Sequence, residues 1–119
     1  MTAPPVGPGT SLIPRPERTP AALRAALARV APHRLGEMER QQDEAMALAA
    51  LTDSLGPITR FLENWTVVVE IARTPATAAR LRAAEHTARS LEPADPAWRA
   101  AMDDIHALHT TARESLSHG

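Results

Sequence analysis

The sequence LGPITRFLENWTVVVEIA, from Leu55 to Ala72, decides the fold class of this chain. Its apolar residues recur at alternating steps of three and four, which is the period of an amphipathic α-helix. Phe61 and Val68 widen the stripe to one side, so we expect this helix in the middle of a bundle. The stripe itself consists of Leu55, Ile58, Leu62, Trp65, Val69 and Ala72.

A short β-strand is the competing interpretation, because residues 65–69 (WTVVV) have high β-propensity. Two observations argue against it. The helical spacing continues through Ile71 and Ala72, and the sequence offers no second strand to pair with the first. We therefore predict a helix here.

Three further helix starts share one pattern, a capping residue followed by proline. The side-chain oxygen of the first residue can accept a hydrogen bond from the first helical turn, and proline fits the first helical position. The pairs are Thr19-Pro20, Thr74-Pro75 and Asp95-Pro96. With the Ala31-Pro32 break, they predict helices over about 20–30, 33–51, 75–91 and 96–116.

The helix over 33–51 is expected to have one apolar and one charged face. Its outer face carries EMERQQDE (37–44), a mixed-charge run typical of a solvated surface. Residues 52–54 (TDS) supply turn and capping chemistry before the central helix. The residues expected to point inward are Leu35, Met38, Ala45, Met46 and Ala49.

The N-terminal segment differs in composition from the rest. Residues 1–18 contain five of the eleven prolines and two of the five glycines, and they have little apolar surface. Such a segment is predicted to be a disordered or extended arm, with Leu12 and Ile13 available to dock it. The remaining residues, 19–119, are predicted to form a single helical domain. The expected fold is an all-α bundle of four to five helices around the central apolar helix.

Chain length, net charge and hydropathy limit the classes of protein to which this chain can belong. A chain of 119 residues has room for one modest core, and its hydrophobic fraction of 44% is largely alanine, with only 3% aromatic residues. The net charge of −1, from 13 basic and 14 acidic residues, argues against a general polyanion binder. No apolar run approaches the ~18 residues of a membrane span, and no secretion signal is visible. We expect a soluble cytoplasmic protein.

Two kinds of chemical site were weighed. Asp103, His106 and His109 are three residues apart and could bind zinc, with His86 or Glu85 completing the site, but the spacing equally fits ordinary surface pairs. We expect no metal and no cofactor. The sequence also lacks a cysteine nucleophile and a glycine-rich phosphate loop, and its many carboxylates lie on a polar face. The prediction is that the protein is not an enzyme.

A nucleic-acid site is the alternative function. Residues 48–65 resemble a helix-turn-helix with Gly56 at the turn, in which Arg60 and Asn64 would face the major groove. Against this, Pro57 and Ile58 occupy the turn and first recognition positions, and little positive charge surrounds the segment. DNA binding is therefore the second interpretation.

The C-terminal helix suggests a surface for a protein partner. Trp98, Ile105 and Leu108 follow one another at helical steps and form a seam that could pack on a partner helix or in a homodimer. Arg73 and Arg80, seven residues apart, could add a surface for an acidic partner. These five residues are the predicted partner-binding set.

The order of motifs is similar to that of a known family. The pattern comprises ALRAAL at Ala22 to Leu27, T-x-S-L-x-P-I-x-x-F-L-x-x-W at Thr52 to Trp65, and the helix from Thr74 to Glu85. It resembles a family of short proteins of unknown function from GC-rich, actinobacterial genomes, sometimes encoded beside toxin–antitoxin genes. The resemblance implies no functional residues. Together with the seam, it favours a non-enzymatic interaction or regulatory module of antitoxin-like character that binds a protein partner.

Overall fold

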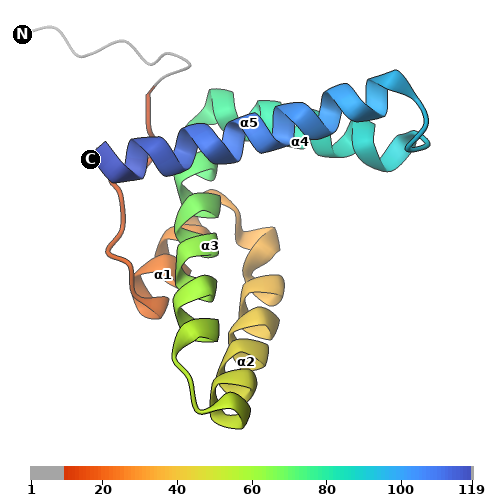
Figure 1. Cartoon of the computed structure of the whole chain (residues 1–119). Helices are drawn as coiled ribbons and strands as arrows, with labels where there is room; N and C mark the ends of the chain where they lie inside the picture. Colours follow the sequence, from red (N-terminus) through yellow and green to blue (C-terminus); the bar gives the residue numbers. More distant parts are fainter. Residues whose placement is uncertain (1–9, 119) are drawn as a thin grey trace, which may run out of the picture. The chain divides into compact units, whose positions relative to one another are not determined.

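The computed structural model describes residues 10–118, which form five α-helices and one short 3₁₀ helix (Figure 1). No strand occurs within these residues, and 65–69 are helical. The all-α prediction is therefore confirmed. The elements are α1 (Pro20–Val30), η1 (Pro32–Arg34), α2 (Leu35–Thr52), α3 (Gly56–Ala72), α4 (Pro75–Ser90) and α5 (Pro96–His118).

The chain divides into two compact units, which are described separately below. One unit is Ile13–Glu70 and contains α1, η1, α2 and most of α3. The other unit combines Ile71–Gly119 with Met1–Leu12, and contains α4 and α5. The assignment of 19–119 to a single domain stays a prediction.

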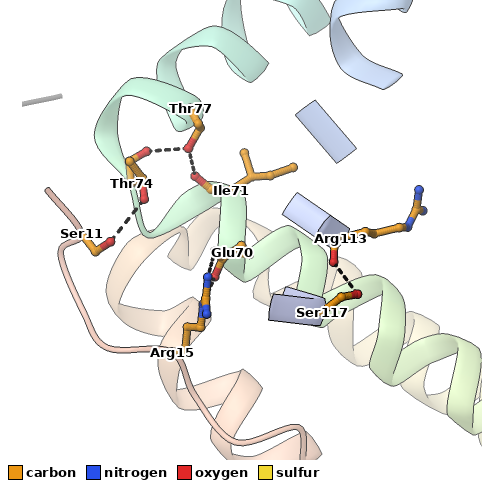
Figure 2. A network of polar contacts seen from close by, with 8 residues as sticks. All are labelled: Ser11, Arg15, Glu70, Ile71, Thr74, Thr77, Arg113 and Ser117. Carbon is orange, nitrogen blue, oxygen red and sulfur yellow. Dashed lines mark hydrogen bonds and ion pairs between the residues drawn. The ribbon is translucent and has the colours of Figure 1, made fainter. Parts of the chain in front are cut away.

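The helix starts follow the predicted capping chemistry in two of three places. Thr19 Oγ1 accepts a hydrogen bond from the Ala22 N–H at 3.2 Å, and Asp95 Oδ1 accepts one from the Ala97 N–H at 2.8 Å. Thr74 precedes a proline as predicted, but its side chain makes no capping bond. Its hydroxyl lies instead 3.4 Å from Ser11 Oγ (Figure 2).

The core of the unit Ile13–Glu70 draws on all three of its α-helices. Trp65 and Val69 of α3 are completely buried, as the apolar stripe of the central helix predicts. Thr66, Val67 and Val68 between them are also buried, so this part of α3 is enclosed on every side. The largest fully buried side chains are Trp65, Leu23, Leu27, Met38 and Val69.

Two residues that were expected in the core are exposed. Leu55 is 75% exposed, because α3 begins only at Gly56 and the helical period does not extend to the residue before it. Met46 is 55% exposed. It follows Ala45 on α2, and a single step along a helix turns a side chain by about 100°. The inward face of α2 therefore does not include it.

The turn between α2 and α3 is built from short polar residues, as 52–54 predicted. Asp53 adopts a left-handed conformation with φ of 53°, and its N–H donates to the carbonyl of Ala49. The Ser54 N–H donates to the same carbonyl at 3.2 Å, and Ser54 Oγ accepts from the Gly56 N–H. These bonds satisfy the end of α2 and the start of α3.

The described part of the N-terminal arm is held in place. Leu12 donates its backbone N–H to the carbonyl of Arg73 at 2.7 Å, and Ile13 is buried. Arg15 Nε and Nη2 donate to the two carboxylate oxygens of Glu70, each at 3.0 Å (Figure 2). Residues 10–18 are therefore bonded to the folded chain, whereas 1–9 lie outside the described residues.

The Arg15–Glu70 pair leads to a prediction about stability. Replacing Arg15 with alanine leaves a carboxylate that is only 11% exposed without its bidentate partner. We expect a loss of about 1–2 kcal/mol of unfolding free energy, measured by urea denaturation. Arg29→Ala, at an exposed arginine in α1, is the control and should change stability little. An equal loss in both variants would contradict the prediction.

This contribution should not vary with pH near neutrality. The hydrogen bond that Arg15 donates to Glu70 raises the pKa of Arg15 above its usual value. A base whose pKa is raised in the folded state stabilises the fold below its unfolded pKa, and this stabilisation is lost only as pH rises through the folded value. For arginine both values lie in strong alkali.

In the second unit, α4 and α5 run antiparallel and side by side (Figure 1). Arg80 of α4 forms an ion pair with Asp104 of α5. In the first turn of α4, the Thr77 hydroxyl donates to the carbonyls of Ile71 and Thr74, at 2.7 and 3.1 Å (Figure 2). The buried residues are Leu81 and Ala84 of α4 and Ala101, Leu108 and Ala112 of α5.

Candidate interaction surface

Most of the exposed large apolar side chains of the described residues lie in one stretch of the sequence. Within residues 10–118, five large hydrophobic side chains are exposed, and four of them lie between positions 46 and 55. This segment is the end of α2 and the turn into α3. Leu51 and Leu55 are the most exposed, at 83% and 75%, and together we call them the hairpin tip. Clustered apolar exposure of this kind marks interaction sites.

Beside the tip lies a groove between α2 and α3, which are neighbours in the structure (Figure 1). We call it the hairpin groove; its volume is about 360 Å³. Apolar side chains and polar side chains both line it, and α1 contributes none. The apolar residues are Ala45, Leu48, Pro57 and Phe61, and the polar residues are Gln41, Glu44, Arg60 and Asn64.

Helical spacing places Leu51 on the same face of α2 as the groove residues. On α2, Glu44, Leu48 and Leu51 are separated by steps of four and three, so they share a face. On α3, Pro57, Phe61 and Asn64 follow the same spacing. Leu51 therefore lies on the groove-facing side of α2, one turn beyond Leu48.

A set of bonds holds the α2 side of the groove. Trp65 Nε1 donates to Gln41 Oε1 at 2.9 Å, and Gln41 Nε2 donates to Glu37 Oε1 at 3.3 Å. The Arg34 guanidinium carbon lies 5.1 Å from the centre of the Trp65 ring, a distance that allows a cation–π interaction. Since Trp65 is fully buried, Gln41 is tied to the core of the unit.

The groove carries one unpaired charge on each wall. Glu44 on α2 and Arg60 on α3 are both exposed, and neither forms an ion pair or a hydrogen bond within residues 10–118. Some other charges of the same unit are paired, for example Arg24 with Glu39, whereas Arg40, Asp43 and Glu63 form no ion pair within the described residues. Chemically, the groove can accept an apolar helix face that carries charges of both signs at its edges.

Arg60 and Asn64, the predicted DNA-reading residues, are both exposed and line this groove. They lie one turn apart on α3, as the sequence indicated. Glu44 lines the same groove, however, and its negative charge opposes a phosphate backbone. DNA binding by these residues stays a prediction.

The predicted partner-binding residues do not form one exposed surface. Leu108 is 4% exposed, and Trp98 and Ile105 are half-buried. Arg80 is paired with Asp104, and the carbonyl of Arg73 accepts the bond from the N-terminal segment. Much of the C-terminal seam is therefore used inside the fold. Partner binding through it stays a prediction.

The residues weighed as a zinc site do not converge. His109 Nδ1 lies 2.9 Å from the carbonyl oxygen of Ile105, within its own helix, and His106 is exposed. In the part of the chain from Thr10 to His118, no three histidine, aspartate or glutamate side chains form a group that could hold a metal ion. This stretch of α5 thus has the geometry of an ordinary helix surface.

The hairpin groove and its tip were not predicted from the sequence. Glu44 was placed on a solvated face and is exposed, but no site was assigned to it. Leu55 was placed in the core, Leu48 entered only as the first residue of the segment 48–65, and Leu51 was given no role. A usable signal was present: Leu48 and Leu51 lie off the inward stripe marked by Met38, so α2 carries a second apolar stripe. A second stripe on one helix predicts a second packing surface.

Comparison with known proteins identifies a family. The model described as "Family of unknown function (DUF6247)" matches residues 12–114, which is most of the chain. The chain belongs to this family. The DUF6247 match includes the whole hairpin groove and tip, and it confirms the resemblance to an uncharacterised family. No curated protein and no solved structure matches the chain.

Among the helices described between residues 10 and 118, none combines the length and the apolar composition that a membrane span requires.

Proposed function

We propose that this DUF6247 chain is a non-enzymatic interaction module that binds another protein through the hairpin groove and tip. One observation carries the proposal: Leu51 and Leu55 are 83% and 75% exposed, at the end of the hairpin that also forms a groove of mixed apolar and polar lining. Burying a leucine side chain is worth about 1.5–3 kcal/mol. A protein surface that covers both leucines gains this energy.

The shape of the site favours a helical ligand. Its apolar residues are spaced along two helices, and helix-in-groove recognition uses such a surface for anchors at positions i, i+3, i+4 and i+7. The polar rim supplies specificity through Glu44 and Arg60. In its finer form the proposal is that of an antitoxin-like regulator, which is supported by the resemblance to proteins encoded beside toxin–antitoxin genes.

The test is affinity capture from native host lysate with the tagged chain. We expect a stoichiometric protein that is recovered by the wild type and lost with the double variant Leu51→Glu/Leu55→Glu. Charging two apolar anchors should weaken binding at least about a hundredfold. Leu12→Glu is the matched control, because Leu12 is also exposed, at 59%, but lies far from the hairpin in sequence. Both variants should give the wild-type circular dichroism spectrum.

Capture that persists in the folded double variant would contradict the proposal.

A second candidate function, DNA binding, is favoured by the exposure of Arg60 and Asn64 on one face of α3. It would be supported by co-eluting DNA of defined sequence whose binding is lost in Arg60→Ala and Asn64→Ala. Absence of DNA, or binding unchanged in these variants, would overturn it.

A further inference from the structure

We infer that the protein that occupies the hairpin groove is a second copy of this chain. Two hairpins would then pack groove to groove as a four-helix interface about a two-fold axis. The inference rests on the proposed function, since it takes the same surface and names the partner. Its basis is the arrangement of charge on the two walls of the groove.

Glu44 and Arg60 carry opposite charges on opposite sides of one groove, yet they do not bond to each other. Arg40, Asp43 and Glu63 of the same unit are likewise exposed and form no ion pair within residues 10–118, but they do not line the groove. Glu44 and Arg60 are therefore the charges that a ligand in the groove would meet. The ligand must offer a cation on the α2 side and an anion on the α3 side.

A second copy offers this pattern. When a two-fold axis runs along the groove, α2 of one copy lies over α3 of the other. Glu44 of each copy then faces Arg60 of the other, so the interface contains the same pair twice, as two-fold symmetry requires. Helices pack at 8–10 Å in such bundles, which brings side chains at equal height into contact.

The apolar residues of the surface fit the same arrangement. Leu48, which is 44% exposed, lines the groove together with the largely buried Phe61, so in this arrangement Leu48 supplies apolar contact between the two copies. Leu51 continues the α2 stripe by one turn and extends the apolar contact toward the turn. An apolar centre with a charged rim is the usual anatomy of a protein interface.

The test uses charge reversal in the full-length chain, with self-association measured by sedimentation velocity over a range of concentrations. We expect the wild type to dimerise. The single variants Glu44→Arg and Arg60→Glu should each weaken dimerisation at least about tenfold, because each replaces two attractive contacts with two repulsive ones. The double variant Glu44→Arg/Arg60→Glu should restore the dimer. A mixture of the two single variants should form a heterodimer.

Asp43→Arg is the matched control. Asp43 is an exposed acid next to Glu44 on α2 but does not line the groove, so its reversal changes the net charge equally and should leave the dimer intact. Circular dichroism establishes that each variant is folded.

A wild type that stays monomeric at every concentration would overturn the inference. Dimerisation that is unchanged in the single charge-reversal variants would also overturn it, as would a folded double variant that does not regain dimerisation. The failure of this inference is distinguishable from that of the proposed function. If the chain is monomeric and captures another protein through Leu51 and Leu55, only the inference of a second copy fails. If the chain is monomeric and captures no protein, both the inference and the proposed function fail.

Discussion

Replacing Trp65 with alanine is expected to lower the free energy of unfolding by about 3–5 kcal/mol, which is the usual cost of such a truncation in a core. Three contributions are lost together. The ring is completely buried, its N–H donates to Gln41 at 2.9 Å, and the Arg34 guanidinium lies 5.1 Å from its centre. Domains of this size are stable by only about 5–15 kcal/mol, so the variant should approach the limit of folding.

Urea denaturation followed by far-ultraviolet circular dichroism measures this loss. Trp98→Ala is the matched control, since it removes the other tryptophan of the chain from a half-buried position. We expect it to cost less than about 1.5 kcal/mol. Trp65→Phe should fall between the two, because it keeps an aromatic ring but loses the hydrogen bond to Gln41. Equal losses for Trp65→Ala and Trp98→Ala would contradict the assignment of Trp65 to the core.

The second large effect is expected from Leu27 in α1. Its side chain is 0% exposed, and truncation to alanine leaves a cavity among the fully buried residues of the unit. The expected loss is about 2–5 kcal/mol of unfolding free energy, with the exact value set by how far the neighbours relax. The midpoint of urea denaturation should fall accordingly, with little change in the slope.

Leu51→Ala provides the comparison, because it is the same chemical change at a position that is 83% exposed. In dilute protein its stability should stay within about 0.5 kcal/mol of the wild type. Its effect should appear instead in binding at the hairpin tip. If Leu51→Ala destabilised the monomer as much as Leu27→Ala, Leu51 would have to be part of the core, and the proposed function would lose its main support.

These two leucines show why the helices could be predicted and the site could not. The span of α1 matches the predicted 20–30, and α4 and α5 begin at the predicted prolines. Capping and proline geometry depend on residues a few positions apart, so the helix starts can be predicted from a single sequence. Leu27 and Leu51 both lie at apolar positions of a helical period. This periodicity does not show which apolar face of a helix is covered by the rest of the chain, so it could not predict that Leu27 is buried and Leu51 exposed.

The same distinction explains the outcome for the candidate residues. Arg60 and Asn64 were predicted to be exposed on one face of a helix, and they are, because their spacing determines it. Their neighbour across the groove, Glu44, comes from another helix, so only packing could reveal it. Leu108 follows the apolar seam of α5, and only packing could reveal that it is buried within the folded chain.

The sequence by itself determined the secondary structure: an all-helical chain with proline-marked helix starts and Trp65 in a central apolar helix. The physical reason is that helix period, capping and proline restriction are local interactions. Only the tertiary structure decided that Leu51 and Leu55 face water and that Glu44 and Arg60 border one groove without bonding to each other. Burial and contacts between helices depend on which helix faces pack against each other, and this packing is determined jointly by residues that are far apart in the sequence.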